Sequence, residues 1–259
     1  RVFSIQRSSL VSVKTPQKIQ VRNLTKRFGN LTVLDRINFS VAKGELVAIV
    51  GPTGCGKTTF LNMLSKLMPA TEGNILIDGE EANPRTHNIS YVFQEPTCLP
   101  WRTVRENVAY GMEIKGVPHN ERMKRSDDIM ELVGLSSCAN LYPNQVSASM
   151  IQRIAVSRAF AVQPDLLLMD EPYGQLDVKL RFYLEDELVN LWRTLQSTIL
   201  FVTHNIEEAV YVADRILVLS NKPTTIKAEI HVDIERPRKL TDPRFVELRR
   251  QVTELIRWW

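Results

Sequence analysis

The sequence predicts an α/β protein in which strands and helices alternate along the chain. Three observations indicate this class: short apolar runs typical of strands recur, a glycine-rich turn joins one of them to a helix, and helical periodicity dominates from about residue 103 to 162. With 259 residues, 44% of them hydrophobic and 24% charged, the chain can bury a sizeable core. Collagen-like, low-complexity and fully disordered proteins are excluded.

The first half of the chain contains several strand candidates and one helix. Strands are expected at the short apolar runs IQVRNL, INFSV, ELVAIVG and NILIDG, and at ISYVFQ in 89–94. Apolar positions 60, 61, 64 and 67 fall at helical spacing and predict a helix from Lys57 to Leu67. Residues 1–18 are largely polar and aperiodic, and we expect them to form an N-terminal extension.

The second half combines helices with strongly apolar strands. The patterns TVRENVAYGMEIKG, HNERMKRSDDIMELVGL and SMIQRIAVSRAFAV predict a helical insert. Strands follow at 165–170, 198–204 and 215–220, and a helix is expected at about 178–195. After Asn221, the run IKAEIHVDI and a periodic final helix form a tail. The helix at 178–195 carries an apolar stripe that we assign to core packing: Leu180, Leu184, Leu188, Trp192 and Leu195.

Cysteine usage and charge exclude several other classes of protein. Cys55, Cys98 and Cys138 are an odd set without CxxC spacing, which favours a reducing compartment over a disulfide framework or a zinc site. No run of about 18 apolar residues occurs, so we expect a cytoplasmic chain that does not itself cross a membrane. The net charge is +4, and the basic residues of 1–34 are interpreted as a solvated surface, with attraction of polyanions as the alternative.

The turn after the run ELVAIV carries a phosphate-binding pattern. GPTGCGKTT satisfies GxxxxGK(S/T) in the strand, loop and helix context that a P-loop requires. The glycines let backbone N–H groups converge on phosphate oxygens, and the helix dipole acts in the same direction. We expect Lys57 to contact the β and γ phosphates, the Thr58 hydroxyl to hold Mg²⁺, and Cys55 to be a small filler. The candidate nucleotide-binding residues are Gly51, Pro52, Thr53, Gly54, Cys55, Gly56, Lys57, Thr58 and Thr59.

Two carboxylates end the apolar strand LLLMD. Asp170 and Glu171 cannot both belong to the core, although acidic residues often end buried strands. With a P-loop upstream, the segment resembles a Walker B element. On this interpretation Asp170 orients the magnesium shell through water, and Glu171 polarises the attacking water.

Gln94 and His204 occupy matching positions at the tips of two predicted strands. Open α/β sheets bind nucleotides at the carboxyl edge of their strands, so both side chains should lie near the phosphates. A lone histidine is more often structural, but the P-loop and the acidic pair reverse that preference. We expect His204 to contact the γ phosphate and Gln94 to meet the metal or the attacking water.

In order, GPTGCGKTT, Gln94, LLLMDEP, YGQLD and VTHNIEEA resemble an ATP-binding cassette (ABC) ATPase, the motor subunit of ABC transporters. The resemblance covers about residues 19–259. It implies a P-loop ABC-type nucleotide-binding domain at 19–220 with a helical subdomain insert at about 96–160, followed by a strand and helix tail at 221–259. The segments FQEPTCLPWRTVRENVAYGMEIKGV and DPRFVELRRQV are similar to the importer group for nitrate, sulfonate, taurine, bicarbonate and related small solutes.

The resemblance also implies roles for residues outside these motifs. Phe28 falls where the family places an aromatic ring that stacks on adenine, with core packing as the competing interpretation. Asp177 matches the D-loop aspartate that helps couple two active sites across a dimer. The family's LSGGQ or LSGGM signature, which closes over the γ phosphate bound to the other subunit, reads VSASM here.

Within this signature Ala148 and Ser149 replace glycines. Their side chains should crowd the close approach of the backbone or restrict positive φ, whereas Ser147 is kept and can still donate a hydrogen bond. In a homodimer both sites inherit the change. In a heterodimer the P-loop of this chain can meet an intact signature.

The resemblance implies an ATP- and Mg²⁺-dependent motor on the cytoplasmic face of the plasma (inner) membrane. The implied partners are permease transmembrane subunits, a second ATPase subunit and, indirectly, a solute-binding protein. The permease should dock on residues 95–115, including Pro100 and Trp101, unless Trp101 is a core residue. One alternative is a catalytically weakened ATP-binding subunit in a heterodimer. Another, an ABC protein of nucleic-acid work, is disfavoured by the mild charge and by the absence of tandem cassettes or long coiled coils.

Overall fold

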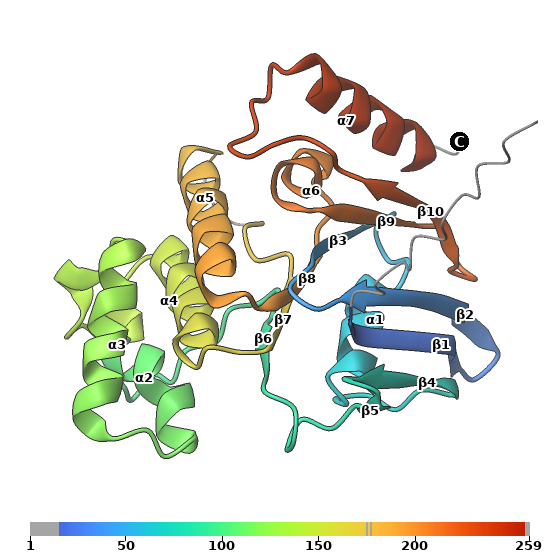
Figure 1. Ribbon diagram of the computed structural model, residues 1–259. Coiled ribbons are helices and arrows are strands. Elements are labelled where there is room, and N and C mark those ends of the chain that lie inside the picture. The colour runs from blue at the N-terminus through green and yellow to red at the C-terminus, as the bar shows by residue number, and fades with distance from the viewer. Residues whose placement is uncertain (1–15, 175, 177, 257–259) are drawn as a thin grey trace, which may run out of the picture.

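The computed structural model describes residues 16–174, 176 and 178–256. Its strands form two sheets, and Figure 1 shows the smaller one beside the larger one. The four-stranded antiparallel sheet has the order β2-β1-β4-β5. Its strands are β1 (Gln17–Phe28), β2 (Leu31–Ala42), β4 (Glu72–Ile77) and β5 (Glu80–Glu81).

The larger sheet contains six strands in the order β10-β9-β3-β8-β7-β6. The five strands from β9 to β6 run parallel, and β10 pairs with β9 in the antiparallel direction. Every residue of β3, β7, β8 and β9 is buried, as expected for apolar strands covered on both faces. The strands are β3 (Leu46–Val50), β6 (Ile89–Val92), β7 (Leu166–Asp170), β8 (Thr198–Val202), β9 (Arg215–Leu219) and β10 (Ile226–His231).

The period of two along these strands divides the interior into two cores. In β3, Leu46, Ala48 and Val50 face one core, and Val47 and Ile49 face the other. The second core is closed by α1 (Lys57–Leu64) and the small sheet, so α1 lies between the two sheets. This arrangement holds the helix that follows the P-loop from both sides.

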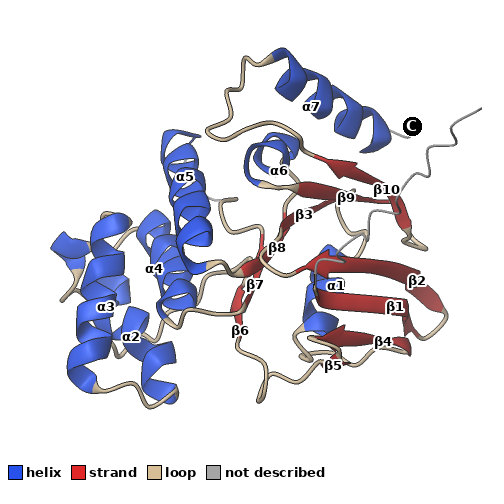
Figure 2. Ribbon diagram, viewed as in Figure 1, coloured by secondary structure: helices blue, strands red, loops and turns tan. Residues whose placement is uncertain are grey.

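The first core is closed by helices, which gather on the opposite side of the larger sheet from α1 (Figure 2). The capping box of Thr103 and Glu106 starts α2, and Ser147 and Asn205 cap α4 and α6. These helices are α2 (Val104–Ile114), α3 (His119–Leu132), α4 (Ala148–Ala161), α5 (Val178–Leu195), α6 (Ile206–Val212) and α7 (Pro243–Ile256).

Most predicted elements are present, with changes at their ends. Helix α5 has the expected bounds, and its apolar stripe packs on the first core. Helix α1 ends at Leu64 instead of Leu67, and the left-handed Lys66 (φ 60°) follows it. Strand β6 ends at Val92, so Gln94 lies in the loop beyond the strand. Within the described ranges, none of the helices has the length and apolar character needed to span a membrane.

Candidate functional site

The P-loop between β3 and α1 depends on two glycines with positive φ. Gly54 has φ 75° and Gly56 has φ 110°, conformations that residues with a Cβ rarely adopt. A Cβ on Gly56 would also lie 2.8 Å from Cγ1 of Val33 and 3.1 Å from Cδ2 of Leu34. Glycine is therefore required at this position both by the backbone and by contact with β2.

The N-terminus of α1 is open to an anion. No side chain caps the helix, and its first turn contains no acidic residue. The Lys57 side chain is buried, and its Nζ donates hydrogen bonds to the carbonyl oxygens of Gly51 (3.0 Å) and Pro52 (3.1 Å). The ammonium group therefore spans the loop beside free helix N–H groups, an arrangement suited to phosphate.

The other P-loop residues differ in exposure. Thr53, Gly54 and Thr58 are exposed, and Pro52 and Thr59 are half-buried. Cys55 is buried, and this burial raises the pKa of its thiol above the usual value. A neutral, enclosed thiol agrees with the small-filler interpretation.

Asp170 and Glu171 follow each other at the end of β7 but have different surroundings. Asp170 is 2% exposed, and its Oδ1 is buried without a hydrogen-bond partner. Burial raises the pKa of Asp170, whereas a hydrogen bond with Thr58 and the charge of Lys57 oppose this rise. Glu171 has a left-handed backbone (φ 47°), and its N–H donates to the Val202 carbonyl at the end of β8 (2.8 Å). The strained turn directs the second carboxylate away from the core.

Three side chains from neighbouring strand ends meet at one carboxylate oxygen. Gln94 Nε2 donates to Glu171 Oε2 at 3.2 Å, and His204 Nδ1 lies 3.0 Å from the same oxygen. Gln94 follows β6, Glu171 follows β7 and His204 follows β8, which are adjacent parallel strands. The structure therefore brings these three predicted residues together at the carboxyl edge of the sheet.

The contacts that hold the His204 loop are absent from the sequence-based site. Thr203 Oγ1 donates to Glu208 Oε2 (2.6 Å), and Asn205 caps α6 through the N–H groups of Glu207 and Glu208. Arg181 on α5 pairs with Glu208 (3.3 Å). An N-cap signal was available in the sequence, Asn205 followed by two acidic residues, and it also predicts the short helix α6.

The VSASM segment forms the ordinary start of a helix. Ser147 has an extended backbone (φ −72°), and its Oγ accepts a hydrogen bond from the Met150 N–H (3.3 Å). Ala148 and Ser149 lie in the first turn of α4, and neither has a positive φ. This conformation agrees with the expectation that side chains at these positions restrict positive φ. Crowding toward a second subunit stays a prediction.

Two aromatic residues that the sequence analysis singled out, Phe28 and Trp101, are exposed. Phe28 is 47% exposed, and Lys26 Nζ lies 4.9 Å from the centre of its ring. Trp101 is 70% exposed. The core-packing alternative is therefore excluded for both. Asp177 lies outside the described residues.

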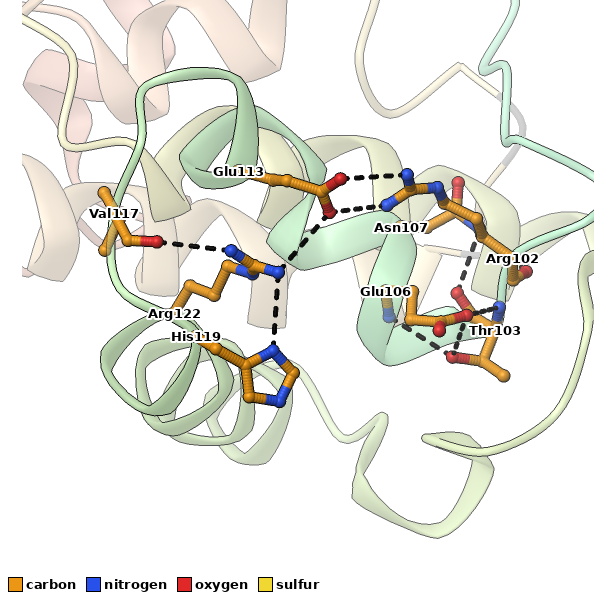
Figure 3. A network of polar contacts seen from close by, with 8 residues as sticks. All are labelled: Arg102, Thr103, Glu106, Asn107, Glu113, Val117, His119 and Arg122. Carbon is orange, nitrogen blue, oxygen red and sulfur yellow. Dashed lines mark hydrogen bonds and ion pairs between the residues drawn. The ribbon is translucent and has the colours of Figure 1, made fainter.

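A network of hydrogen bonds and ion pairs surrounds α2 just after Trp101, and Figure 3 shows Arg102, Asn107 and Glu113 in it. The fully buried Asn107 accepts from the Leu99 N–H (2.7 Å) and donates to the carbonyls of Leu99 (3.1 Å) and Arg102 (3.0 Å). Arg102 forms a bidentate pair with Glu113 on α2 (2.7 and 3.1 Å). The exposed Trp101 therefore lies in a turn whose backbone is hydrogen-bonded to Asn107 on both sides, at Leu99 and at Arg102.

Comparisons with known proteins agree with this geometry. The family model described as "ABC transporter" matches residues 34–174. An uncharacterized ABC transporter ATP-binding protein of Methanocaldococcus jannaschii is 42% identical over 244 residues, which cover 93% of this chain and 91% of that protein. An aliphatic sulfonates import ATP-binding protein, SsuB, of Bacillus anthracis is 38% identical over 229 residues (88% and 90%).

Solved structures give the same result. A dimeric ATP-binding cassette in a post-hydrolysis state, bound to ADP and Pi, matches with a TM-score of 0.76 and 31% identity. The match covers 84% of this chain and 100% of that chain.

Proposed function

The chain belongs to the ABC transporter family as an ATP-binding subunit, and from this premise we propose that it is the ATP-hydrolysing motor of an importer for a small solute. The solute is an anion of the nitrate, sulfonate, taurine or bicarbonate type. Relatives named for aliphatic sulfonate import support this choice. In this proposal residues 19–220 form the ATPase domain, residues of about 96–160 its helical subdomain, and residues 221–259 the tail.

The observation that carries the proposal is the meeting of Gln94 and His204 at Glu171 Oε2. ATP places its phosphates on the P-loop N–H groups, with Lys57 at the β and γ phosphates and adenine stacked on Phe28. Glu171 then accepts the proton of the attacking water, and His204 stabilises the γ phosphate while holding the carboxylate. Gln94 orients the water from the other side.

The residues beside this carboxylate fit Mg²⁺. Across the described part of the chain no three His, Cys, Asp or Glu side chains are grouped to hold a metal ion. Mg²⁺ in phosphate sites instead takes one or two protein oxygens together with substrate and water oxygens. Asp170, with its unpartnered buried oxygen, and the Thr58 hydroxyl supply such donors, with Gln94 at the edge. Bound there, Mg²⁺ would neutralise charge on the phosphates.

The proposed partners follow from the family and from the exposed surfaces. A second ATPase subunit contacts the bound nucleotide through its signature segment, and Ser147 and Asp177 of this chain serve the other site. The permease binds the displayed turn at Pro100 and Trp101, which places the chain peripherally at the cytoplasmic face of the inner membrane. A solute-binding protein delivers the solute to the same permease. Nucleic acid is not among the proposed partners.

The test is Mg²⁺-dependent phosphate release by the purified, assembled transporter. Glu171→Gln keeps the shape of the side chain but cannot accept the proton, so the rate should fall at least about 100-fold while ATP still binds. Lys57→Ala should lose binding itself. If wild-type protein is as slow as Glu171→Gln, the motor assignment fails.

A second candidate is a weakened ATP-binding subunit in a heterodimer with another ATPase. The VSASM segment favours it, because Ala148 and Ser149 present side chains at the start of α4 where the family has glycines. Mass analysis of the isolated assembly separates the two candidates. Two copies of this chain support the homodimeric motor, and one copy beside a different ATPase supports the heterodimer.

A further inference from the structure

A buried threonine outside every motif connects two parts of the candidate site, the P-loop and the β1–β2 hairpin that carries Phe28. Thr224 lies between β9 and β10 and is 0% exposed. Its Oγ1 donates a hydrogen bond to the carbonyl oxygen of Cys55, inside the P-loop, at 2.5 Å. The two residues are separated by 169 positions, so no sequence motif contains both.

The backbone of Thr224 is bound to β2 at the same time. Its N–H donates to the Val33 carbonyl (3.0 Å), its carbonyl accepts from the Asp35 N–H (2.9 Å), and it forms an isolated parallel bridge with Leu34. Val33 and Leu34 are also the residues against which Gly56 packs. The P-loop and β2 are therefore joined both directly and through one threonine.

This connection has a geometric consequence for each half of the site. In a trans peptide the carbonyl and the following N–H point in opposite directions. Holding the Cys55 carbonyl toward Thr224 therefore fixes the Gly56 N–H in the opposite direction. On the other side, β2 pairs with β1 through Leu31 and Phe28, so anchoring β2 also anchors the hairpin that presents the exposed Phe28 ring.

We propose that Thr224 is a positioning residue for ATP, which holds the phosphate-binding loop and the Phe28 hairpin in a fixed relation. The proposal rests on the proposed function, because it assumes that this loop and this ring bind the two ends of the nucleotide. Thr224 touches neither end. It acts through Cys55 and β2.

The experiment measures the Kd of ATP by calorimetry on the full chain. Thr224→Val keeps the branched shape but leaves the Cys55 carbonyl without its donor, and should weaken binding about tenfold. Thr224→Ser keeps the hydroxyl and should stay within about twofold of wild type. Thr198→Val is the matched control: Thr198 is also 0% exposed, and its hydroxyl accepts from the Gly44 N–H at the other end of the larger sheet. It should lower thermal stability without weakening ATP binding.

A double-mutant cycle with Phe28→Ala provides a readout that general destabilisation does not produce. In wild type and in Thr198→Val, Phe28→Ala should weaken binding by the same factor. In Thr224→Val the factor should shrink at least about threefold, because the ring is no longer held in register with the loop. Equal factors in all three backgrounds, or equal ATP affinity of Thr224→Val and Thr198→Val, overturn the proposal. Lys57→Ala distinguishes failure of the Thr224 proposal from failure of the proposed function. If Lys57→Ala binds ATP as tightly as wild type does, the proposed function itself is wrong.

Discussion

The two helix N-termini on which the candidate site depends are built in opposite ways. Helix α1 follows the left-handed Gly54 and Gly56 and has no side-chain cap. Helix α4 follows Ser147, whose hydroxyl accepts from the Met150 N–H as an ordinary N-cap. The first N–H groups of α1 therefore stay available to a ligand. In α4, by contrast, one of the first N–H groups is already hydrogen-bonded to the Ser147 side chain.

The difference shows why glycine is needed at one terminus and dispensable at the other. The open start of α1 is held in place by packing, with Gly56 against Val33 and Leu34 and with Lys57 across the loop. The start of α4 is helical and solvent-facing, so side chains at Ala148 and Ser149 fit without backbone strain. The fold of this chain therefore accommodates side chains at both positions without backbone strain.

The strongest way to break this comparison is Gly56→Ala. In this variant the Cβ would lie 2.8 Å from Val33 Cγ1, on a backbone with φ 110°. The strain should cost about 2 to 4 kcal/mol and distort the loop. ATP binding should weaken at least about 30-fold. Thermal shift with ATP measures the effect, and the variant should lose the stabilisation that ligand confers on wild type. Gly79→Ala, a positive-φ glycine outside the site with open space around its Cβ position, is the control for backbone strain alone. If ATP raises the melting temperature of Gly56→Ala as much as that of wild type, glycine is not required at the start of α1.

A second test concerns the hydrogen bond between α4 and the turn that carries Glu171, the proposed catalytic residue. The buried Gln152 donates through Nε2 to the Pro172 carbonyl, next to Glu171. Gln152→Met leaves that carbonyl without its donor, which should cost about 1 to 3 kcal/mol of stability. Because the carbonyl lies next to Glu171, kcat should also fall about tenfold. KM for ATP should stay unchanged because the P-loop is untouched. Ser157→Ala, on the same helix at a buried hydroxyl without a partner, should leave kcat at the wild-type value. A change in KM alone contradicts the interpretation.

Removing the cap of α4 sharpens the comparison. Ser147→Ala should cost about 1 kcal/mol of folding stability. Ser126→Ala removes a buried hydroxyl that donates to the Arg122 carbonyl in α3 (2.7 Å) and should cost a similar amount, so the two variants are matched in denaturant unfolding. Only Ser147→Ala should also slow ATP hydrolysis by the assembled transporter, because only Ser147 is proposed to face the partner's phosphate. An equal decrease in both variants assigns the loss to stability.

The smallest expected effect is an increase in ATPase turnover. Ala148→Gly with Ser149→Gly should raise ATPase turnover of a homodimeric transporter about threefold, or about 0.7 kcal/mol in the transition state. The same change should lower the stability of α4, because glycine costs about 1 kcal/mol relative to alanine inside a helix. Phosphate release and unfolding are measured on the same preparation. Unchanged turnover shows that these side chains do not crowd the partner.

Local patterns predicted most of the fold. The apolar strand LLLMD, the glycine-rich turn before Lys57 and the stripe of α5 each depend on fewer than about twenty neighbouring residues, and each is present in the structure. The expectation that Gln94 and His204 lie at one sheet edge followed from strand direction, and they meet at Glu171. Element ends were predicted less accurately: α1 ends at Leu64, before the left-handed Lys66, and β6 ends at Val92.

The sequence by itself determined which chemical groups are present and which strand or helix carries each. Glycine spacing, apolar periodicity and capping residues are local, so they can be read from neighbouring positions. Only the tertiary structure decided which distant polar groups satisfy one another: Thr224 with Cys55, Arg181 with Glu208, and Gln152 with the Pro172 carbonyl. These pairings arise because buried donors and acceptors need partners, and the pairing of distant segments leaves no period in the sequence.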